Sequence, residues 1–307
     1  MMIDAPGLSL RVEPSNGWSA EGPLAERALE FAYRAVGLAP AVRTAGINPA
    51  AHLPPRRIIV ESAPREHVGL GVGTQLGLAV ARGLAASWGI EASVPALAKS
   101  VGRGLRSALG VYGFEQGGVL VEAGKVNNEL SPLVARLPFP EAWRVVFVVP
   151  STATGRHGAE ERAAFERLTA PLAATESLSR LVLLGMLPAL AAGDLEEFGE
   201  AVHDFNARSG EMFAPAQGGI YGNTEVADLI SWLRSQGVRG VGQSSWGPGV
   251  FAVVGDEDQG QCLAARVRTR AADAEAYVAK VLNVGHGLEV VSEEADHTLG
   301  SEALTPR

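Results

Sequence analysis

The feature that most constrains this chain is a stretch with glycine at alternate positions, Gly69, Gly71 and Gly73, which leads directly into an apolar segment. Over residues 76–84, apolar side chains recur every four positions, and this spacing predicts a helix with one buried face. A short strand is predicted just before the glycines, over residues 57–61. Because glycine lets the main chain approach a ligand closely and the first amides of a helix attract anions, this order predicts a cradle for phosphate or pyrophosphate. Tight packing of the loop on the helix is the alternative.

Several common motifs are excluded. No Gly-Lys-Ser/Thr follows the glycines, so the loop is not a Walker A loop, and Thr74 stands where the dinucleotide fingerprint requires glycine. The chain has no Gly-x-Ser-x-Gly nucleophile elbow and no HExxH pair, which leaves triad hydrolysis and zinc proteolysis without support. The single cysteine, Cys262, excludes an internal disulfide and a multi-cysteine zinc site, and we interpret it as a small buried apolar side chain.

Composition points to a soluble protein that acts on small molecules. The 307 residues carry a formal net charge of −8 and contain no block of lysine and arginine, which argues against nucleic acid or an anionic membrane as the main partner. The N-terminus shows no export signal. The strongest apolar run, residues 181–192, contains Gly185 and Pro188 and is too short to cross a bilayer. We therefore expect a cytoplasmic protein.

The alternation of strand and helix patterns predicts an α/β protein with two domains. Composition shifts after Pro150, so we place the domains at residues 1–150 and 151–291, followed by a polar tail at 292–307. Asp194 is expected to cap a helix. Strands are predicted over 8–12, 57–61, 118–122, 144–149 and 250–254, and helices over 23–36, 94–101, 159–168, 176–187, 194–207 and 224–236, while 277–284 fits either.

The second candidate site is a turn that presents two guanidinium groups three residues apart, Arg103 and Arg106, between glycines. Guanidinium groups bind phosphate or carboxylate in a forked geometry that lysine cannot match. Simple solvation of two surface arginines is the alternative. The glycines that follow, at 113, 117 and 118, favour a crowded approach to a ligand.

The third candidate site is a loop in which polar side chains and an indole lie between glycines. Such a loop offers polar side chains around the flat apolar face of the indole, which suits an aromatic or sugar-phosphate ligand. The alternative is a surface turn whose indole covers the hydrophobic core. Its side chains are those of Gln243, Ser244, Ser245 and Trp246. Arg156-His157-Gly158 is a weaker candidate. The isolated histidines, which we expect to be solvent-facing or structural, are His52, His203, His286 and His297.

Together these residues resemble the GHMP kinase superfamily and, within it, the β-ribofuranosylaminobenzene 5′-phosphate synthases of methanopterin biosynthesis. The superfamily opens a helix with a Pro-x3-Gly-Leu-Gly loop, and here Pro64 stands one residue further back. The Thr-Gln ending of the loop, the Gly-Arg-Gly-x-Arg-Ser turn at 102–107, the Phe-Glu-x-Gly-Gly stretch at 114–118 and the loop at 242–248 are similar to the synthases. These matches span residues 60–254.

The resemblance implies a two-lobed α/β (α+β) fold, with an N-terminal lobe like ribosomal protein S5 domain 2 and a ferredoxin-like C-terminal lobe. It also implies a decarboxylating phosphoribosyltransferase, which is a pentosyltransferase. In this reaction 4-hydroxybenzoate or 4-aminobenzoate condenses with phosphoribosyl pyrophosphate, and CO2 and pyrophosphate are released. The implied cofactor is Mg²⁺, with its ligands unknown. The two acids are nearly isosteric, so the sequence does not choose between them. The expected assembly is a homodimer, because dimers are the commonest assembly of soluble enzymes.

The resemblance also implies roles for the three candidate sites, and we expect the glycine loop and the arginine turn to converge on a single polyanionic sugar. The loop residues Gly69, Gly71, Gly73, Thr74 and Gln75 would bind phosphate or pyrophosphate. Arg103 and Arg106 would hold the phosphate or the benzoate carboxylate, and the residues at 243–246 would orient the sugar or the ring. His67 is the nearest candidate for proton transfer, with a structural turn as the alternative.

Two rival functions remain open. The first is a GHMP-type kinase that uses ATP, which is disfavoured because Pro150, Ser151 and Thr152 stand where such a kinase would place an Asp base. The second is a truncated, non-catalytic ligand-binding homologue. The synthases open with an Arg-x-His-x-Gly-Leu-x-Asp segment and a glycine-rich hairpin ahead of the equivalent of residues 8–12, so we expect the N-terminal lobe to lack its first hairpin.

Overall fold

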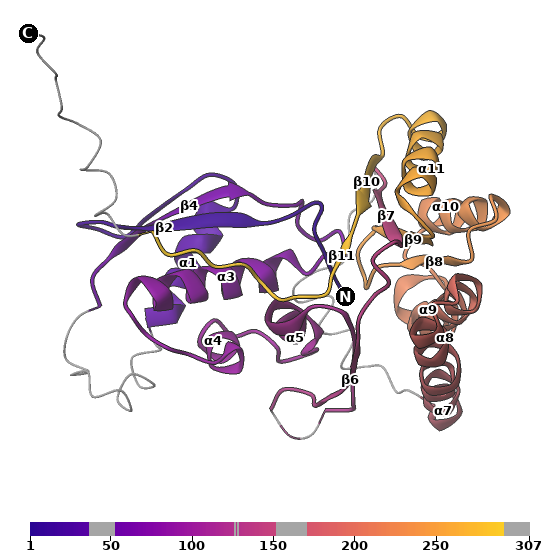
Figure 1. The fold of residues 1–307 in the computed structure, drawn as a ribbon, viewed down its shortest axis with the longest axis horizontal. Helices are drawn as coiled ribbons and strands as arrows, with labels where there is room; N and C mark the ends of the chain where they lie inside the picture. The colour runs from indigo at the N-terminus through magenta and orange to yellow at the C-terminus, as the bar shows by residue number, and fades with distance from the viewer. Residues whose placement is uncertain (37–52, 126, 128, 152–170, 292–307) are drawn as a thin grey trace, which may run out of the picture.

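The computed structural model describes residues 1–36, 53–125, 127, 129–151 and 171–291, which form two lobes placed side by side (Figure 1). Each lobe has one larger sheet and its own helices, and two further sheets have two strands each. The predicted helix at 159–168, together with His52, His157 and His297 and the tail at 292–307, lies outside the described residues. The two-lobed α/β architecture predicted from the sequence is confirmed.

Two of the four helices described in the first lobe pack on a three-stranded sheet of order β2-β4-β3, and the other two pack against these helices. Strand β4 is central, antiparallel to β2 and parallel to β3. The strands are β2 (Ser9–Pro14), β3 (Ser19–Glu21) and β4 (Arg56–Ser62), and the helices are α1 (Ala25–Ala35), α3 (Val72–Ser87), α4 (Val94–Ser100) and α5 (Leu109–Gln116).

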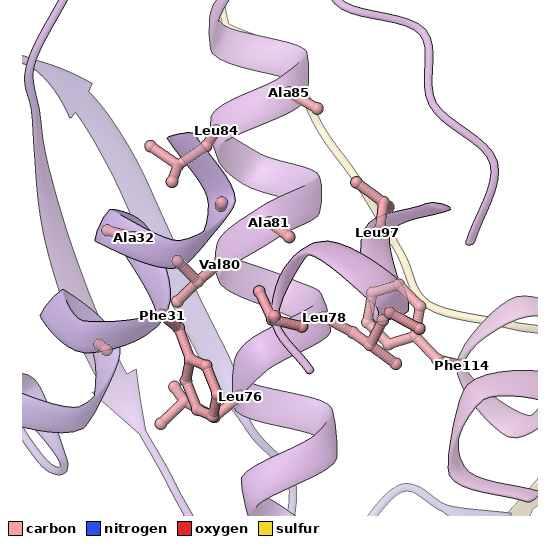
Figure 2. Packing of buried hydrophobic residues seen from close by; sticks show 14 of the residues in the cluster. Phe31, Ala32, Leu76, Leu78, Val80, Ala81, Leu84, Ala85, Leu97 and Phe114 are labelled. Carbon is pink, nitrogen blue, oxygen red and sulfur yellow. The ribbon is translucent and has the colours of Figure 1, made fainter. Parts of the chain in front are cut away.

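The core of this lobe lies between α1 and α3 (Figure 2). Helix α1 buries Ala28, Phe31, Ala32 and Ala35, whose spacing of three and four residues places them on one face. Phe31 is 2% exposed and packs against α3. The apolar repeat along α3 that the sequence predicts is buried. This packing sets where the first turn of α3 lies relative to α1.

The second lobe is built on a four-stranded antiparallel sheet of order β10-β7-β9-β8. Three helix starts carry an acidic or amide N-cap, and Asp194 accepts from the Glu197 amide at 3.0 Å, as predicted. The strands are β7 (Arg144–Val149), β8 (Gly240–Gln243), β9 (Val250–Val254) and β10 (Glu275–Ala279), and the helices are α9 (Leu195–Gln217), α10 (Thr224–Ser235) and α11 (Glu257–Arg270).

The chain crosses between the lobes more than once. Strand β7 pairs with β9 and β10, so the second sheet begins at Arg144, ahead of the boundary placed at residue 150. Strand β1 (Met2–Ile3) pairs with β11 (Val281–Leu282), and the segment after β11 runs back across the first lobe (Figure 1). The strands predicted at 118–122 and 277–284 are β5 (Val119–Glu122), which pairs with β6 (Leu133–Leu137), and β10 with β11.

Two sequence-based expectations were wrong. Cys262 is exposed, because the buried face of α11 is formed by Gly260, Leu263, Ala264 and Val267. The run at 181–192 belongs to a helix of 21 residues, Leu172–Ala192, made of α7 (Leu172–Leu181), a π-helical turn η3 (Val182–Met186) and α8 (Leu187–Ala192).

This long helix does not break at Pro188, which lies at the start of α8 directly after the π-helical turn. With a mean hydropathy of 1.2, the helix is long and apolar enough to cross a membrane. Only 6% of its most apolar window is buried in the structure. A single helix of this kind is weak evidence for a membrane span.

Candidate anion-binding site

The two turns predicted to bind anions line one hollow of about 2260 Å³ between the lobes. The glycine loop and the start of α3 form part of its wall, and the turn that carries Arg103 and Arg106 forms another part. Ser244, Ser245 and Trp246 line it from the second lobe. Three segments that are far apart in sequence therefore face one space, as the hypothesis of a shared site requires.

The glycine loop ends in a helix start that can accept an anion. Gly71 is the N-cap of α3 with φ +65°, and its carbonyl accepts from the Thr74 amide at 2.9 Å and the Gln75 amide at 3.2 Å. The amides of Val72 and Gly73 come earlier in the first turn, where a helix provides no carbonyl partner. The positive end of the 16-residue helix α3, with its first amides, therefore lies at the wall of the hollow.

The loop from the second lobe holds the glycine loop tightly. The Ser244 hydroxyl donates to the Gly69 carbonyl at 2.9 Å, and the Gly249 amide donates to the Val68 carbonyl at 3.2 Å. Gly69 has φ +95°, and a Cβ there would lie 2.2 Å from the Ser244 carbonyl oxygen. Glycine is therefore needed at 69 for both its backbone conformation and its contact.

Gln243 does not line the hollow. Its side chain is buried, its Nε2 donates to the Gly247 carbonyl at 3.0 Å, and its Oε1 accepts from the Gly222 amide at 2.8 Å. The main chain of Gln243 is also held by Asn206 of α9, at 2.9 and 2.8 Å. These contacts brace the loop, which differs from the substrate contact expected for this amide.

The remaining predicted residues lie at the surface of the hollow. His67 and Ser245 are exposed and both have positive φ, +62° and +55°, which is uncommon outside glycine and clusters at functional sites. Trp246 is 9% exposed and meets Phe213 edge to face at 5.2 Å. Gln75 Nε2 donates to the Gly110 carbonyl at 3.0 Å, which ties the start of α3 to the turn before α5.

Arg103 and Arg106 differ in their surroundings. Arg106 is exposed at the rim of the hollow. The guanidinium of Arg103 lies over the ring of Phe31, 4.9 Å from its centroid, and Arg103 Nε is buried without a hydrogen-bond partner. Burial lowers the pKa of Arg103 to about 10, and the positive charges of Arg27, Arg34 and Arg106 act in the same direction. This cation would gain from an anion beside it.

Arg27 and Glu66, which were not predicted as site residues, also line the hollow and form an ion pair there. Arg27 comes from α1, and burial lowers its pKa. No motif surrounds Arg27, and only its position one helical turn before the buried Phe31 indicates which way it faces. Glu66 stands inside the glycine-rich segment that begins at Pro64, so its position was visible although its role was not.

No group of three or more histidine, cysteine or acidic side chains that could hold a metal ion occurs among the described residues. The described side chains therefore do not form a magnesium cage. A Mg²⁺ ion bound to the phosphates of a ligand needs few protein carboxylates, so the lining of the hollow is compatible with such an ion.

Comparison with known proteins identifies the fold and the relatives. The model of the C-terminal domain of GHMP kinases matches residues 186–273. A putative homoserine kinase from Listeria monocytogenes has a TM-score of 0.63 at 17% identity, over 91% of this chain and 88% of that one. The mevalonate kinase of L. major in complex with R-mevalonate has a TM-score of 0.61 at 15% identity, over 90% and 86%. The fold is that of the GHMP kinases.

Relatives in sequence carry the name β-ribofuranosylphenol 5′-phosphate synthase. The one from Methanothermobacter thermautotrophicus is 36% identical over 213 residues, covering 65% of this chain and 63% of that protein. The one from Archaeoglobus fulgidus is 34% identical over 203 residues, covering 61% of each. This chain therefore spans less than two thirds of the length of these relatives.

Proposed function

On the premise that the chain belongs to the GHMP kinase superfamily, we propose that it is an enzyme that transfers ribose 5-phosphate from phosphoribosyl pyrophosphate to an aromatic acid, with loss of CO2. Its homology to the β-ribofuranosylphenol 5′-phosphate synthases supports this proposal. The observation that carries the proposal is the shared hollow. Amides at the start of α3 and guanidinium groups on a separate turn face the same space, as a ligand with two phosphate-bearing ends requires.

The proposed reaction balances without a proton donor for the ring. The ring carbon that bears the carboxylate attacks C1 of the ribose, and the bond from C1 to the pyrophosphate oxygen breaks with its electron pair leaving on pyrophosphate. The bond from the ring to the carboxylate then breaks, which releases CO2 and returns its electron pair to the ring. His67 at the edge of the hollow is therefore not required as an acid, which favours the structural role for it.

The side chains of the hollow would stabilise the departing pyrophosphate. Negative charge grows on its oxygens as the C1 bond stretches, and Arg103 and Arg106 with the amides of Val72 and Gly73, which line the hollow, would neutralise it. Mg²⁺ would enter bound to phosphoribosyl pyrophosphate, as part of the substrate. The aromatic acid would lie against the apolar wall from the second lobe, which includes Phe147 and Trp246.

The name of the relatives favours 4-hydroxybenzoate over 4-aminobenzoate, because a ribofuranosylphenol arises from a hydroxybenzoate. The test is to incubate the protein with magnesium, phosphoribosyl pyrophosphate and either acid labelled with ¹⁴C at the carboxyl group. We expect labelled CO2 and pyrophosphate in equal amounts, faster with 4-hydroxybenzoate. Binding of phosphoribosyl pyrophosphate without CO2 release would reject the synthase, and ADP formation from ATP with a small alcohol would favour the kinase.

A further inference from the structure

Arg27 reaches the start of α3 from a different helix. A Cβ built at Gly73 would lie 2.6 Å from Arg27 Nη2 and 3.4 Å from Arg103 Nη2, so the two guanidinium groups lie against the same bare backbone position. Gly73 is the second residue of α3. A side chain at 73 would take the space that the guanidinium groups occupy. Glycine at this position therefore lets two cations sit beside the first amides of the helix.

The two cations belong to a cluster with more positive than negative charge. The guanidinium groups of Arg27, Arg34 and Arg103 lie 5.9, 5.6 and 4.9 Å from the ring centroid of the buried Phe31. The electron-rich face of an aromatic ring attracts such cations and keeps them close to one another. Among the described residues, Arg27 pairs with Glu66 and Arg34 pairs with the exposed Glu30, whereas no carboxylate pairs with Arg103.

Glu66 occupies the place beside these cations that an anion would take. Its carboxylate binds Arg27 and lines the hollow, with 22% of its side chain exposed against 29% for Arg27. The pair is thus buried enough to be held in place and open enough for a dissolved ligand to reach. A pyrophosphate carries more charge than one carboxylate and can bridge two guanidinium groups in forked geometry.

We propose that Arg27 and Arg103 bind the pyrophosphate group together at the start of α3, and that Glu66 is an internal carboxylate that this anion displaces from Arg27. The choice of pyrophosphate rests on the proposed function, whereas the displacement rests on the geometry alone. Arg27 is then a binding residue contributed by α1, and Glu66 sets how tightly the empty site holds its cations. The expected consequence is that removing the charge of Glu66 strengthens anion binding.

Inorganic pyrophosphate is the probe, and its affinity is measured by isothermal titration calorimetry on the full chain. Glu66→Gln should bind pyrophosphate about fivefold more tightly, since a competing and partly exposed ion pair is removed. The matched control is Glu21→Gln. It removes the same charge from the pair with Arg57, at 2.7 Å and outside the hollow, and it should leave the affinity nearly unchanged.

Arg27→Gln should weaken binding by about tenfold or more, because a charged donor is lost. Since this variant leaves Glu66 unpaired, the double variant Arg27→Gln/Glu66→Gln is the sharper test. It has the net charge of the natural chain, yet it should still bind more weakly. Melting temperatures of all variants identify any that fail to fold, and in that case Glu66→Gln and Glu21→Gln decide the question alone.

Three results would overturn the inference: equal gains for Glu66→Gln and Glu21→Gln, no gain for Glu66→Gln, or natural affinity in the double variant. These results concern binding of pyrophosphate. The proposed function fails separately if labelled CO2 is not released while pyrophosphate binding still depends on Arg27. Conversely, CO2 release with no dependence of binding on Arg27 rejects the inference and keeps the function.

Discussion

Exchange of Gly69 for alanine should be far more damaging than the same exchange at Gly71, two residues later. Both glycines have positive φ, +95° and +65°, and a Cβ in the left-handed region costs about 1–2 kcal/mol. At Gly71 a Cβ would meet no atom within 4 Å, so this is the whole expected loss in the free energy of unfolding. At Gly69 the added Cβ would lie 2.2 Å from the backbone oxygen of Ser244 and 2.9 Å from the Cβ of Ser244.

Backbone atoms cannot swing aside as a side chain does, so the Gly69→Ala methyl has to push apart the loops of the two lobes. Overpacking of this kind costs about 1–3 kcal/mol, which brings the total to about 2–5 kcal/mol. Loss of the hydrogen bond from the Ser244 hydroxyl accounts for about 1 kcal/mol, and Ser244→Ala measures it separately. Urea unfolding of the three variants gives the comparison. Equal losses for Gly69→Ala and Gly71→Ala would refute the claim that the contact across the lobes matters.

Other predictions concern ligand binding and pH. Arg106→Ala should abolish product formation with the melting temperature nearly unchanged, because the side chain is exposed; retained CO2 release would remove it from the site. Gly73→Ala should weaken pyrophosphate binding in calorimetry at little cost in stability, since its Cβ would displace the flexible end of Arg27; unchanged affinity would contradict this. Burial lowers the pKa of His286 below its usual 6.5, so the stability from its neutral form is present above about pH 6.5 and is lost as the pH falls through the lowered pKa. His286→Phe keeps the stack on Phe114. This variant should show a smaller fall in melting temperature from pH 7.5 to 5 than the natural chain, and an equal fall would show that His286 is not the source of the pH dependence.

The structural features that the sequence predicts correctly are those that depend on local patterns. The apolar repeat along α3, the glycine loop before it and the N-cap at Asp194 each depend on residues close together in the chain, and each is present. The convergence of the glycine loop with the turn at 103–106 was predicted from the resemblance, because no local pattern relates segments 30 residues apart.

The predictions that differ from the structure concern features that depend on contacts between residues far apart in the chain. Gln243 has the chemistry of a ligand-binding amide, but buried backbone groups of its own loop and of Gly222 take up its hydrogen bonds. The domain boundary was placed at a proline, whereas strand pairing assigns β7 to the second sheet. Exposure of Cys262 depends on which face of α11 meets the sheet, and the helix carries too few apolar residues for the sequence to show it.

The position of Arg27 follows from core packing, which connects stability with binding. A Cβ at Gly77 would lie 3.2 Å from the Phe31 ring, so α1 approaches α3 closely at this point. One helical turn earlier on each helix stand Arg27 and Gly73, and they are in contact as well. Residues four apart lie on the same face of a helix, so the contact that buries Phe31 also brings the guanidinium of Arg27 to the first amides of α3. An arginine four residues before a buried phenylalanine, opposite two glycines four residues apart, is thus the sequence signal for this part of the site, and it becomes visible only once the two helices are known to pack together.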